Sequence, residues 1–235
     1  MKNILITGAG RGLGLEITKQ ELKNGNFVFA TYRTLSDDLI NLTNNYKNIK
    51  LIRMDVGNDF SVKAASDEIK LSVNKLDVVY NNAGVLNNNH KSGFFNLSFD
   101  ISVLDIININ TIGFLRVIQN FYSLINKNSM IVVITSGAGS IQMALKNNYD
   151  IDKINIPYYI SKAGLNMVAC LFKNNLEKLG AKIILIDPGR IKTDMGGKNS
   201  KIEVSKSAEK ILLFAHNKKI AKNIFIDFNG NKIKL

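Results

Sequence analysis

Only one cysteine, two prolines and no tryptophan occur among the 235 residues of this chain. The lone Cys170 cannot form an internal disulfide. Because it lies in an apolar helical stretch, we interpret it as a small core residue in a reducing compartment. No uninterrupted apolar run reaches the roughly 18 residues that a membrane span needs, and the chain enters its first strand at once, which argues against a signal peptide. These absences predict a cytoplasmic protein with no membrane partner.

Acidic residues are scarce beside basic ones, with 19 Asp and Glu against 31 Lys and Arg and a formal net charge of +12. The lysines are scattered through every segment, and their abundance together with Asn and Ile is typical of A/T-rich codon usage. We therefore expect no nucleic-acid partner, although a basic field would help to attract a phosphorylated cofactor. The length and the hydrophobic share of 46% predict one domain over residues 1–235 with a full core.

Apolar strand-like runs alternate with helical patterns along the chain. This order predicts an α/β fold: a doubly wound, mostly parallel sheet of seven strands with helices on both faces. Strands are expected near residues 2–7, 27–32, 49–54, 76–80, 129–135, 182–187 and 223–227. Helices are expected near residues 12–24, 36–45, 59–73, 100–126, 158–179 and 203–216. Two Asn-rich segments, 86–91 and 146–155, are expected to be loops.

The first predicted strand ends in a turn with four glycines, Thr7-Gly8-Ala9-Gly10-Arg11-Gly12-Leu13-Gly14, and a helical pattern follows. Strand, glycine turn and helix together aim the free N–H groups of the first helical turn at an anion. A Cβ atom in this turn would keep a pyrophosphate away from the backbone. The spacing differs from G-x-G-x-x-G, and a tight turn without a ligand is the alternative. We expect a dinucleotide site that includes Gly8, Arg11, Gly12, Leu13 and Gly14.

The end of the second predicted strand decides between two nicotinamide cofactors. NAD-binding folds place an acidic residue here to accept a hydrogen bond from the ribose 2′-hydroxyl, but this chain has no carboxylate from Phe29 until Asp37. Arg33, and Arg11 in the glycine turn, offer guanidinium groups that would pair with a 2′-phosphate. Two solvated surface arginines are the alternative. The pattern favours NADP(H), with NAD(H) as the second choice.

Two further segments follow predicted strands, so their polar groups would meet at the carboxyl edge of the sheet, where ligands bind in such folds. After the third strand, the Asp55 carboxylate and the adjacent Val56 would contact an adenine, or Asp55 would cap the next helix. After the fourth strand, Asn81, Ala83 and Gly84 would pack against a ribose. Both segments are therefore candidates for cofactor binding.

The fifth and sixth predicted strands end at the same edge. Ser136 directly follows an apolar strand, so its hydroxyl would emerge there. The turn after the sixth strand, with Pro188, Gly189, Ile191 and Thr193, would suit a nicotinamide seat, or it would only end the strand.

Tyr158 and Lys162 are four residues apart and therefore share one face of a predicted helix. An ammonium beside a phenol favours the phenolate, so we expect Lys162 to lower the pKa of Tyr158 from about 10 toward the working pH. The tyrosine could then donate a proton to a carbonyl oxygen. Two helix residues that share a face by chance are the alternative. Asn110, inside the predicted helix 100–126, is an unfavourable helical residue because its amide competes for backbone hydrogen bonds.

These motifs occur together in an order that resembles the short-chain dehydrogenase/reductase family over essentially the whole chain. The segments PGRIKTDMGG and FIDFNG are most similar to the branch that contains carbonyl reductases of the Sniffer type and the bacterial C-factor. The resemblance implies a Rossmann-like fold. It also implies roles for four residues: general acid and base for Tyr158, tuning and ribose binding for Lys162, carbonyl orientation for Ser136, and water positioning for Asn110.

The resemblance implies NADPH-dependent reduction of a small aldehyde or ketone, with no metal. A nucleotide-binding signalling or regulatory protein with little turnover is the alternative. The family also suggests a homodimer or homotetramer that forms through the helices near 100–126 and 158–179. Apolar side chains expected around the substrate are Leu86, Phe94, Ile141, Met143 and Met195.

Two features depart from the family pattern. Ser136 and Tyr158 are 22 positions apart, more than in many members, and the extra residues from Lys146 to Ile156 are expected to form a loop over the mouth of the active site. Asp187 stands where the carbonyl reductase branch commonly has a histidine.

Overall fold

A computed structural model describes residues 1–86, 101–197, 199–217 and 224–235 of the chain. A seven-stranded sheet runs through it in the order β3-β2-β1-β4-β5-β6-β7, and every neighbouring pair of strands is parallel. The strands are β1 (Asn3–Ile6), β2 (Phe27–Tyr32), β3 (Ile49–Arg53), β4 (Val78–Asn81), β5 (Met130–Ile134), β6 (Lys182–Asp187) and β7 (Phe225–Asp227). The predicted doubly wound α/β fold is confirmed.

The central strands are short apolar runs, as expected of strands that are buried on both faces. All residues of β4 and all residues of β5 are buried. In the register of the sheet, Val79 of β4 lies opposite Leu5 of β1 and Ile131 of β5. The carboxyl ends of β1, β4, β5 and β6 therefore lie next to one another along one edge.

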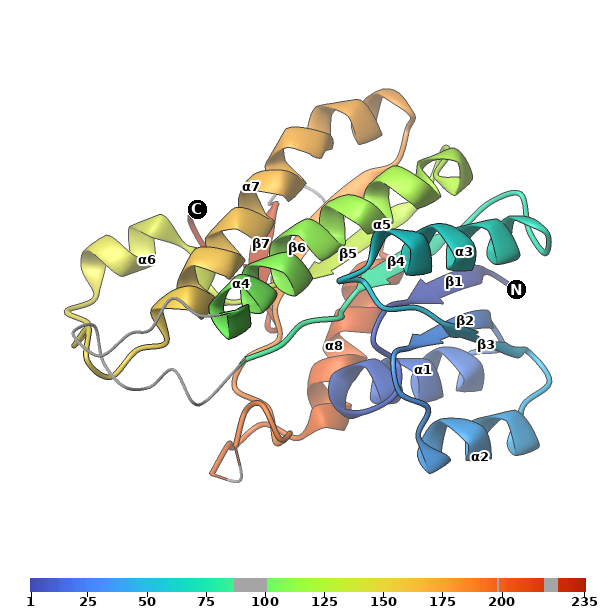
Figure 1. Cartoon of the computed structure of the whole chain (residues 1–235), viewed down its shortest axis with the longest axis horizontal. Helices are drawn as coiled ribbons and strands as arrows, with labels where there is room; N and C mark the ends of the chain where they lie inside the picture. Colours follow the sequence, from blue (N-terminus) through green and yellow to red (C-terminus); the bar gives the residue numbers. More distant parts are fainter. Residues whose placement is uncertain (87–100, 198, 218–223) are drawn as a thin grey trace.

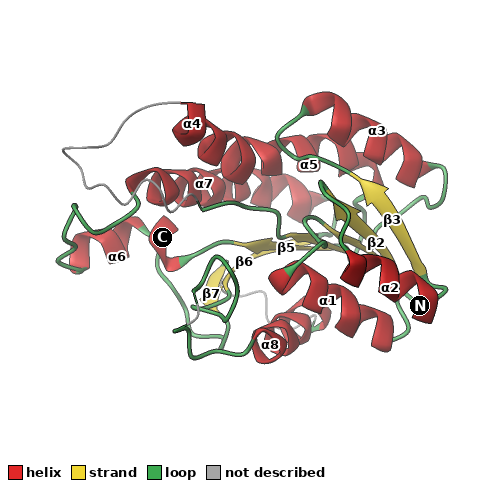
Figure 2. Cartoon of the chain, turned by 60° about the horizontal axis from the view of Figure 1, so that its bottom comes forward, coloured by secondary structure: helices red, strands yellow, loops and turns green. Residues whose placement is uncertain are grey.

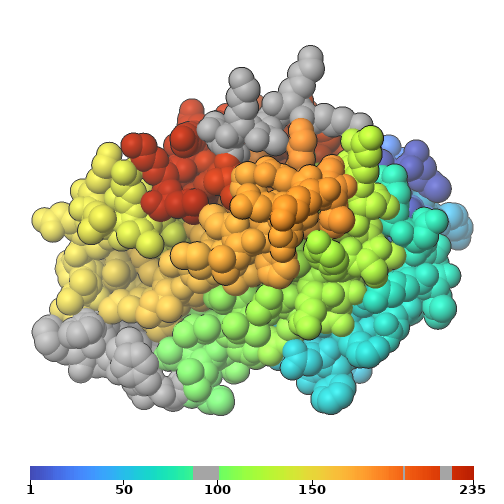
Figure 3. Space-filling model, turned by 90° about the horizontal axis from the view of Figure 1, so that it is seen from above, coloured from blue at the N-terminus to red at the C-terminus, as the bar shows by residue number. Residues whose placement is uncertain are grey.

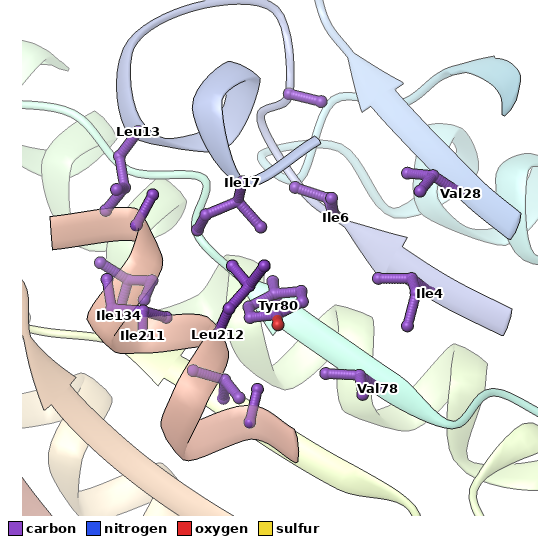
Figure 4. Close-up of a cluster of buried hydrophobic side chains, with 14 of the residues drawn as sticks. Ile4, Ile6, Leu13, Ile17, Val28, Val78, Tyr80, Ile134, Ile211 and Leu212 are labelled. Atoms are coloured by element: carbon purple, nitrogen blue, oxygen red, sulfur yellow. The ribbon is translucent and has the colours of Figure 1, made fainter. Parts of the chain in front are cut away.

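Helices α1, α2 and α8 cover one face of the sheet (Figures 1 and 2). They span Gly12–Lys23, Asp37–Asn45 and Val204–His216. Ile17 of α1 and Leu212 of α8 meet the Tyr80 ring of β4 in a buried cluster (Figure 4). Burying a side chain of this size is worth about 1.5–3 kcal/mol, so this apolar contact holds α1 and α8 against the sheet.

The opposite face carries α3 (Asp59–Lys70), α4 (Ile101–Ile107), α5 (Gly113–Phe121) and α7 (Ile156–Lys178). Phe121 of α5 packs with β-strand residues on one side of this layer, and Leu165 of α7 packs with Phe114 on the other. Figure 3 looks onto this face, where α5 in green and α7 in orange lie side by side at the surface.

Helices α2, α3 and α7 each begin where a polar side chain satisfies a free backbone N–H of the first turn. Ser36 caps α2, Asn58 caps α3 and Asn155 caps α7. Pro157 then occupies the first turn of α7, where its fixed φ angle suits a helix and its missing N–H costs nothing. The helix therefore starts two residues before the predicted position and includes Tyr158 in its first turn.

The prediction of one continuous α-helix over residues 100–126 is wrong in the middle of this range. A π-helical turn, η3 (Asn108–Ile112), separates α4 from α5, and a 3₁₀ turn, η4 (Tyr122–Leu124), follows α5. π-Helical turns are rare and frequently occur at functional sites. This one contains Asn110, which is buried and forms side-chain hydrogen bonds outside its own helix.

The continuous helical stretch Ile101–Leu124 has the length and composition of a membrane span, with a mean hydropathy of 1.6 over an 18-residue window. The stretch meets this criterion although polar residues interrupt it, because mean hydropathy over a window allows isolated polar residues. Of that window, 44% is buried inside the protein. Val117, Ile118 and Phe121 belong to the core beneath it, and the core helix of a globular fold has the same composition as a span.

The segment between β5 and α7 contains a helix that the sequence analysis missed. After a 3₁₀ turn, η5 (Gly137–Gly139), the helix α6 spans Ile141–Lys146. None of its six residues is buried, so it lacks the apolar periodicity from which helices are predicted. Residues 147–155 are irregular, as expected for this insertion. Of the other predicted loop, residues 87–91 lie outside the described part of the chain.

Candidate active site

The glycine turn lies between the end of β1 and the start of α1. Gly8 and Gly12 have φ angles of +68° and +56°, a backbone conformation that favours glycine. A Cβ atom on Gly14 would clash with the carbonyl oxygen of Gly8, so only glycine allows α1 to approach β1 so closely. Arg11 occupies the N-cap position of α1, and its side chain forms no capping hydrogen bond. No side chain at the N-cap therefore occupies the N–H groups of this first turn, which is the arrangement that suits an anion.

Asn82 and Thr7 hold the glycine turn against the end of β4. The Thr7 hydroxyl accepts hydrogen bonds from the backbone N–H groups of Asn82 (3.0 Å) and Ala83 (2.9 Å). The Asn82 side chain donates to the carbonyl oxygens of Thr7 (2.9 Å) and Gly8 (3.1 Å). Sequence reasoning selected Asn81, Ala83 and Gly84 and missed Asn82. The doubled asparagine was the available signal, since only one of two successive side chains can face the glycine turn.

The two candidate phosphate-binding arginines lie in different surroundings. Arg11 forms an ion pair with Asp194 at 2.6 Å, and both side chains are mostly exposed. This pair spans from the glycine turn to the segment after β6, where a Cβ atom on Gly12 would lie 3.5 Å from the Thr193 side chain. Arg33 is exposed directly after β2. The guanidinium of Arg11 is therefore already used by a carboxylate.

Asp55 does not cap α3, so that alternative for its role is wrong. The cap is Asn58, whose side-chain oxygen accepts the N–H of Ser61 at 2.9 Å. Asp55 instead accepts the N–H of Gly57 at 2.9 Å through one carboxylate oxygen. Val56 is buried and packs against Gly113 at the start of α5, where an added Cβ atom would lie 3.0 Å from its side chain.

Ser136, Tyr158 and Lys162 meet at the carboxyl edge of β5. The Ser136 side chain is hydrogen-bonded to the Tyr158 hydroxyl. Lys162 is buried, and its ammonium donates to the carbonyl oxygen of Ile134 at 3.1 Å. That ammonium lies 5.6 Å from the centre of the Tyr158 ring. The three predicted residues therefore form one cluster, although 22 positions separate the serine from the tyrosine.

The expectation that Lys162 lowers the pKa of Tyr158 is wrong for this structure. Burial raises the pKa of Tyr158 to about 12; the hydrogen bond from Ser136 opposes this rise, and the charge of Asp187 adds to it. Burial also lowers the pKa of Lys162 to about 8, an effect that Asp187 partly opposes. Desolvation outweighs the attraction between ammonium and phenolate here, because the ammonium is directed toward the Ile134 carbonyl.

Asn110 joins the π-helical turn to two other parts of the cluster. Its amide accepts the N–H of Val85 at 2.7 Å and donates to the Val85 carbonyl oxygen at 2.9 Å. It also donates to the hydroxyl of Ser161, which follows Tyr158 by three residues on α7, at 3.0 Å. The side chain of Asn110 thus fixes the segment after β4 relative to the helix that carries Tyr158.

The turn after β6 contains four of the residues predicted to bind the cofactor. Gly189 has a φ angle of +75°, and the Pro188 carbonyl oxygen accepts a hydrogen bond from Ser207 of α8 at 2.8 Å. Ile191 is buried. The Thr193 hydroxyl accepts the N–H of Gly196 at 3.1 Å, so this predicted ligand for a cofactor also stabilises its own turn.

The predicted substrate-lining side chains have different exposures. Leu86 and Met143 are half-buried, whereas Ile141 and Met195 are exposed. The Met143 sulfur lies next to Gly137, one residue after Ser136. Phe94 lies outside the described residues.

Comparisons with known proteins show the family to which this chain belongs. The family model described as short chain dehydrogenase matches residues 2–203. The short-chain dehydrogenase/reductase atnB of an Arthrinium species is 31% identical over 207 residues, which cover 83% of this chain and 76% of that protein.

Two solved carbonyl reductases share the fold over the whole chain. Carbonyl reductase Sniffer of Drosophila melanogaster superposes with a TM-score of 0.87 at 24% identity, covering 100% of both chains. The NADPH-bound carbonyl reductase from chicken fatty liver superposes with a TM-score of 0.83 at 25% identity, covering 100% of this chain and 99% of that one. On the family model and the relative together, this chain is an oxidoreductase of the short-chain dehydrogenase/reductase family.

Proposed function

We propose that this protein reduces a small aldehyde or ketone with NADPH, and that Tyr158 supplies the proton. The observation that carries the proposal is the hydrogen-bonded Ser136–Tyr158 pair with the buried Lys162 beside it, at the sheet edge that also carries the glycine turn. In this proposal, residues 1–235 act as one unit.

The residues present fit a nicotinamide dinucleotide. The open N-terminus of α1 and the glycines at positions 8, 12 and 14 suit its pyrophosphate, and Arg33 suits a 2′-phosphate. Asp55 and Val56 would contact the adenine. The remaining contacts would come from Arg11, Leu13, Asn81, Ala83, Gly84, Tyr158, Lys162, Pro188, Gly189, Ile191 and Thr193. The preference for the phosphorylated cofactor is also supported by the NADPH-bound chicken carbonyl reductase.

When bound, the reduced cofactor would supply hydride to the carbonyl carbon. Burial raises the pKa of Tyr158 to about 12, so the phenol is protonated at neutral pH and would donate its proton to the carbonyl oxygen. Ser136 would orient that oxygen by a hydrogen bond, and Lys162 would stabilise negative charge as the tyrosine gives up its proton. Asn110 would keep the helix of Tyr158 in place and position a water molecule for proton return.

The surface over α4, α5 and α7 supports assembly into a homodimer or homotetramer. Large apolar side chains are exposed on it, which is unusual for a surface that faces only water. They are Ile101 and Leu104 of α4, Ile112 of η3, and Ile160, Met167 and Leu171 of α7. We place the protein in the cytoplasm, free of membrane and nucleic acid, as the composition predicts.

The test is a panel of aldehydes and ketones incubated with the purified protein and either NADPH or NADH, followed by nicotinamide absorbance. We expect oxidation of NADPH by at least one carbonyl compound, and its loss in Tyr158→Phe. Full turnover in that variant would contradict the proposed mechanism. Tight cofactor binding without turnover on any carbonyl would favour the regulatory alternative instead.

A further inference from the structure

Asp187 ends β6 and lies between the two turns that frame the candidate active site. One of its carboxylate oxygens accepts the backbone N–H of Gly137 at 2.9 Å. The other accepts the backbone N–H of Gly189 at 2.9 Å. Gly137 belongs to the turn that begins at Ser136, and Gly189 belongs to the turn proposed to seat the nicotinamide. One side chain therefore connects two loops that are about 50 residues apart in sequence.

The fit around this carboxylate is tight. A Cβ atom on Gly137 would lie 3.2 Å from the carboxylate oxygen and 3.3 Å from the Met143 sulfur. Two N–H donors approach from different sides, so the position needs two acceptor atoms. An asparagine offers a single acceptor oxygen and would direct its NH₂ group at the second N–H.

The negative charge of Asp187 also acts on both candidate catalytic residues. It favours the protonated form of Tyr158 and the charged form of Lys162. The other titratable group that acts on Tyr158 is Tyr159, on the same helix. Among the described residues, Asp187 is thus the carboxylate that acts on this pair, and it comes from β6, not from the helix itself.

We propose that Asp187 is a positioning residue of the active site: it holds the Ser136 turn against the turn after β6 and places a negative charge behind the Tyr158–Lys162 pair. This inference rests on the proposed function. Without the carboxylate, Ser136 would move relative to the phenol, and Tyr158 would release its proton more readily. The charge thus opposes ionisation of the Tyr158 phenol.

Asp227 supplies a matched control. It is the register partner of Asp187 on β7, and its carboxylate also accepts backbone N–H groups of the following turn, those of Asn229 (2.9 Å) and Asn231 (2.8 Å). Unlike Asp187, Asp227 is not one of the groups that shift the pKa of Tyr158 or Lys162. Asp187→Asn and Asp227→Asn therefore remove the same charge from the same kind of turn.

The experiment follows the ¹³Cζ resonance of Tyr158 with pH in protein labelled on tyrosine, with Tyr158→Phe to assign the signal. We expect Tyr158 to titrate at lower pH in Asp187→Asn than in the unchanged protein, and Asp227→Asn to leave it unchanged. We also expect kcat to fall about 10- to 100-fold in Asp187→Asn with a smaller change in KM, because the reacting groups are displaced. An unchanged titration, or an equal change in both variants, would overturn the inference.

The resonance titration decides the inference even where no carbonyl compound is turned over. Absence of turnover in the unchanged protein would instead count against the proposed function alone. Should Asp187→Asn not fold, Asp187→Ser removes the same charge and keeps one hydroxyl acceptor. We expect Tyr158 to titrate at lower pH in this variant too, and an unchanged titration would overturn the inference.

Discussion

Two buried tyrosine clusters lie at opposite edges of the sheet, and they differ in how completely their polar groups are satisfied. At the amino edge, the Tyr80 hydroxyl donates to the Glu21 carboxylate at 2.6 Å, and the same carboxylate contacts His216 (2.8 Å) and Asn26 (2.6 Å). Lys2 in turn contacts the other ring nitrogen of His216 at 2.7 Å. Figure 4 shows Tyr80 among the apolar side chains of this core.

The cluster at the carboxyl edge is open by comparison. The Tyr158 hydroxyl is paired with Ser136. Within the described part of the chain, the Lys162 ammonium donates to one partner, a backbone carbonyl oxygen, although it can donate three hydrogen bonds. Burial raises the pKa of both tyrosines, and at Tyr80 the Glu21 charge adds to the rise. The comparison teaches that a buried tyrosine with satisfied neighbours stabilises the fold, whereas one with unused hydrogen-bonding capacity beside it is suited to a ligand.

A large effect on turnover should distinguish Lys162, at the carboxyl edge, from Lys2, at the amino edge. Lys162→Met should lower turnover by ~100-fold or more, since the residue that stabilises charge on Tyr158 is lost. Lys2→Met, at the other edge, should leave turnover unchanged. Steady-state kinetics on one verified carbonyl substrate decides the point, and equal losses in the two variants would remove the distinction between the clusters.

Tyr80→Phe should affect stability and leave turnover unchanged. Removing a hydrogen bond to a buried carboxylate should lower the free energy of unfolding by about 2 kcal/mol, measured by urea denaturation, without lowering kcat. A loss of turnover with intact stability would show that the amino-edge cluster also affects the chemistry.

Arg33→Ala sharpens the assignment of the carboxyl edge as a cofactor site. The exposed Arg33 guanidinium should contribute about tenfold to NADPH affinity, or about 1.4 kcal/mol, and nothing to NADH affinity. Arg11→Ala should have a smaller effect, because Arg11 already pairs with Asp194. Titrations followed by nicotinamide fluorescence measure both, and equal affinity for NADH and NADPH in the unchanged protein would reverse the cofactor preference.

The smallest expected effect is a pH dependence of stability at the amino edge. Burial by itself would raise the pKa of Glu21, but the hydrogen bond and charge of His216, with the bonds from Tyr80 and Asn26, hold it below its ordinary value. The folded state therefore binds the proton less well than the unfolded chain, and stability should fall as pH drops below about 4.5. Unfolding free energies measured from pH 7 to pH 3 should show this fall, and Glu21→Gln should flatten it. An identical slope in Glu21→Gln would contradict the account.

The sequence predicted the sheet well because its strands are apolar runs and its glycine turn is a local motif. It also placed Tyr158 and Lys162 on one helix face and Ser136 at the carboxyl edge of the sheet, and the resemblance to the family joined the three in one site. What it could not predict depends on contacts between distant segments. The hydrogen bonds of Asn82, the bridge formed by Asp187 and the π-helical turn at Asn110 are of this kind. The error on the pKa of Tyr158 has the same origin, because burial follows from the whole fold.

The most direct test measures both turnover and stability for a variant of each tyrosine. Turnover and the free energy of unfolding are measured for the unchanged protein, Tyr158→Phe and Tyr80→Phe under the same conditions. Tyr158→Phe should lose ~10²- to 10⁴-fold in kcat and keep its stability, while Tyr80→Phe should lose stability and keep its kcat. Full turnover in Tyr158→Phe would contradict the account, because the open cluster at the carboxyl edge would then not be where the proton is transferred.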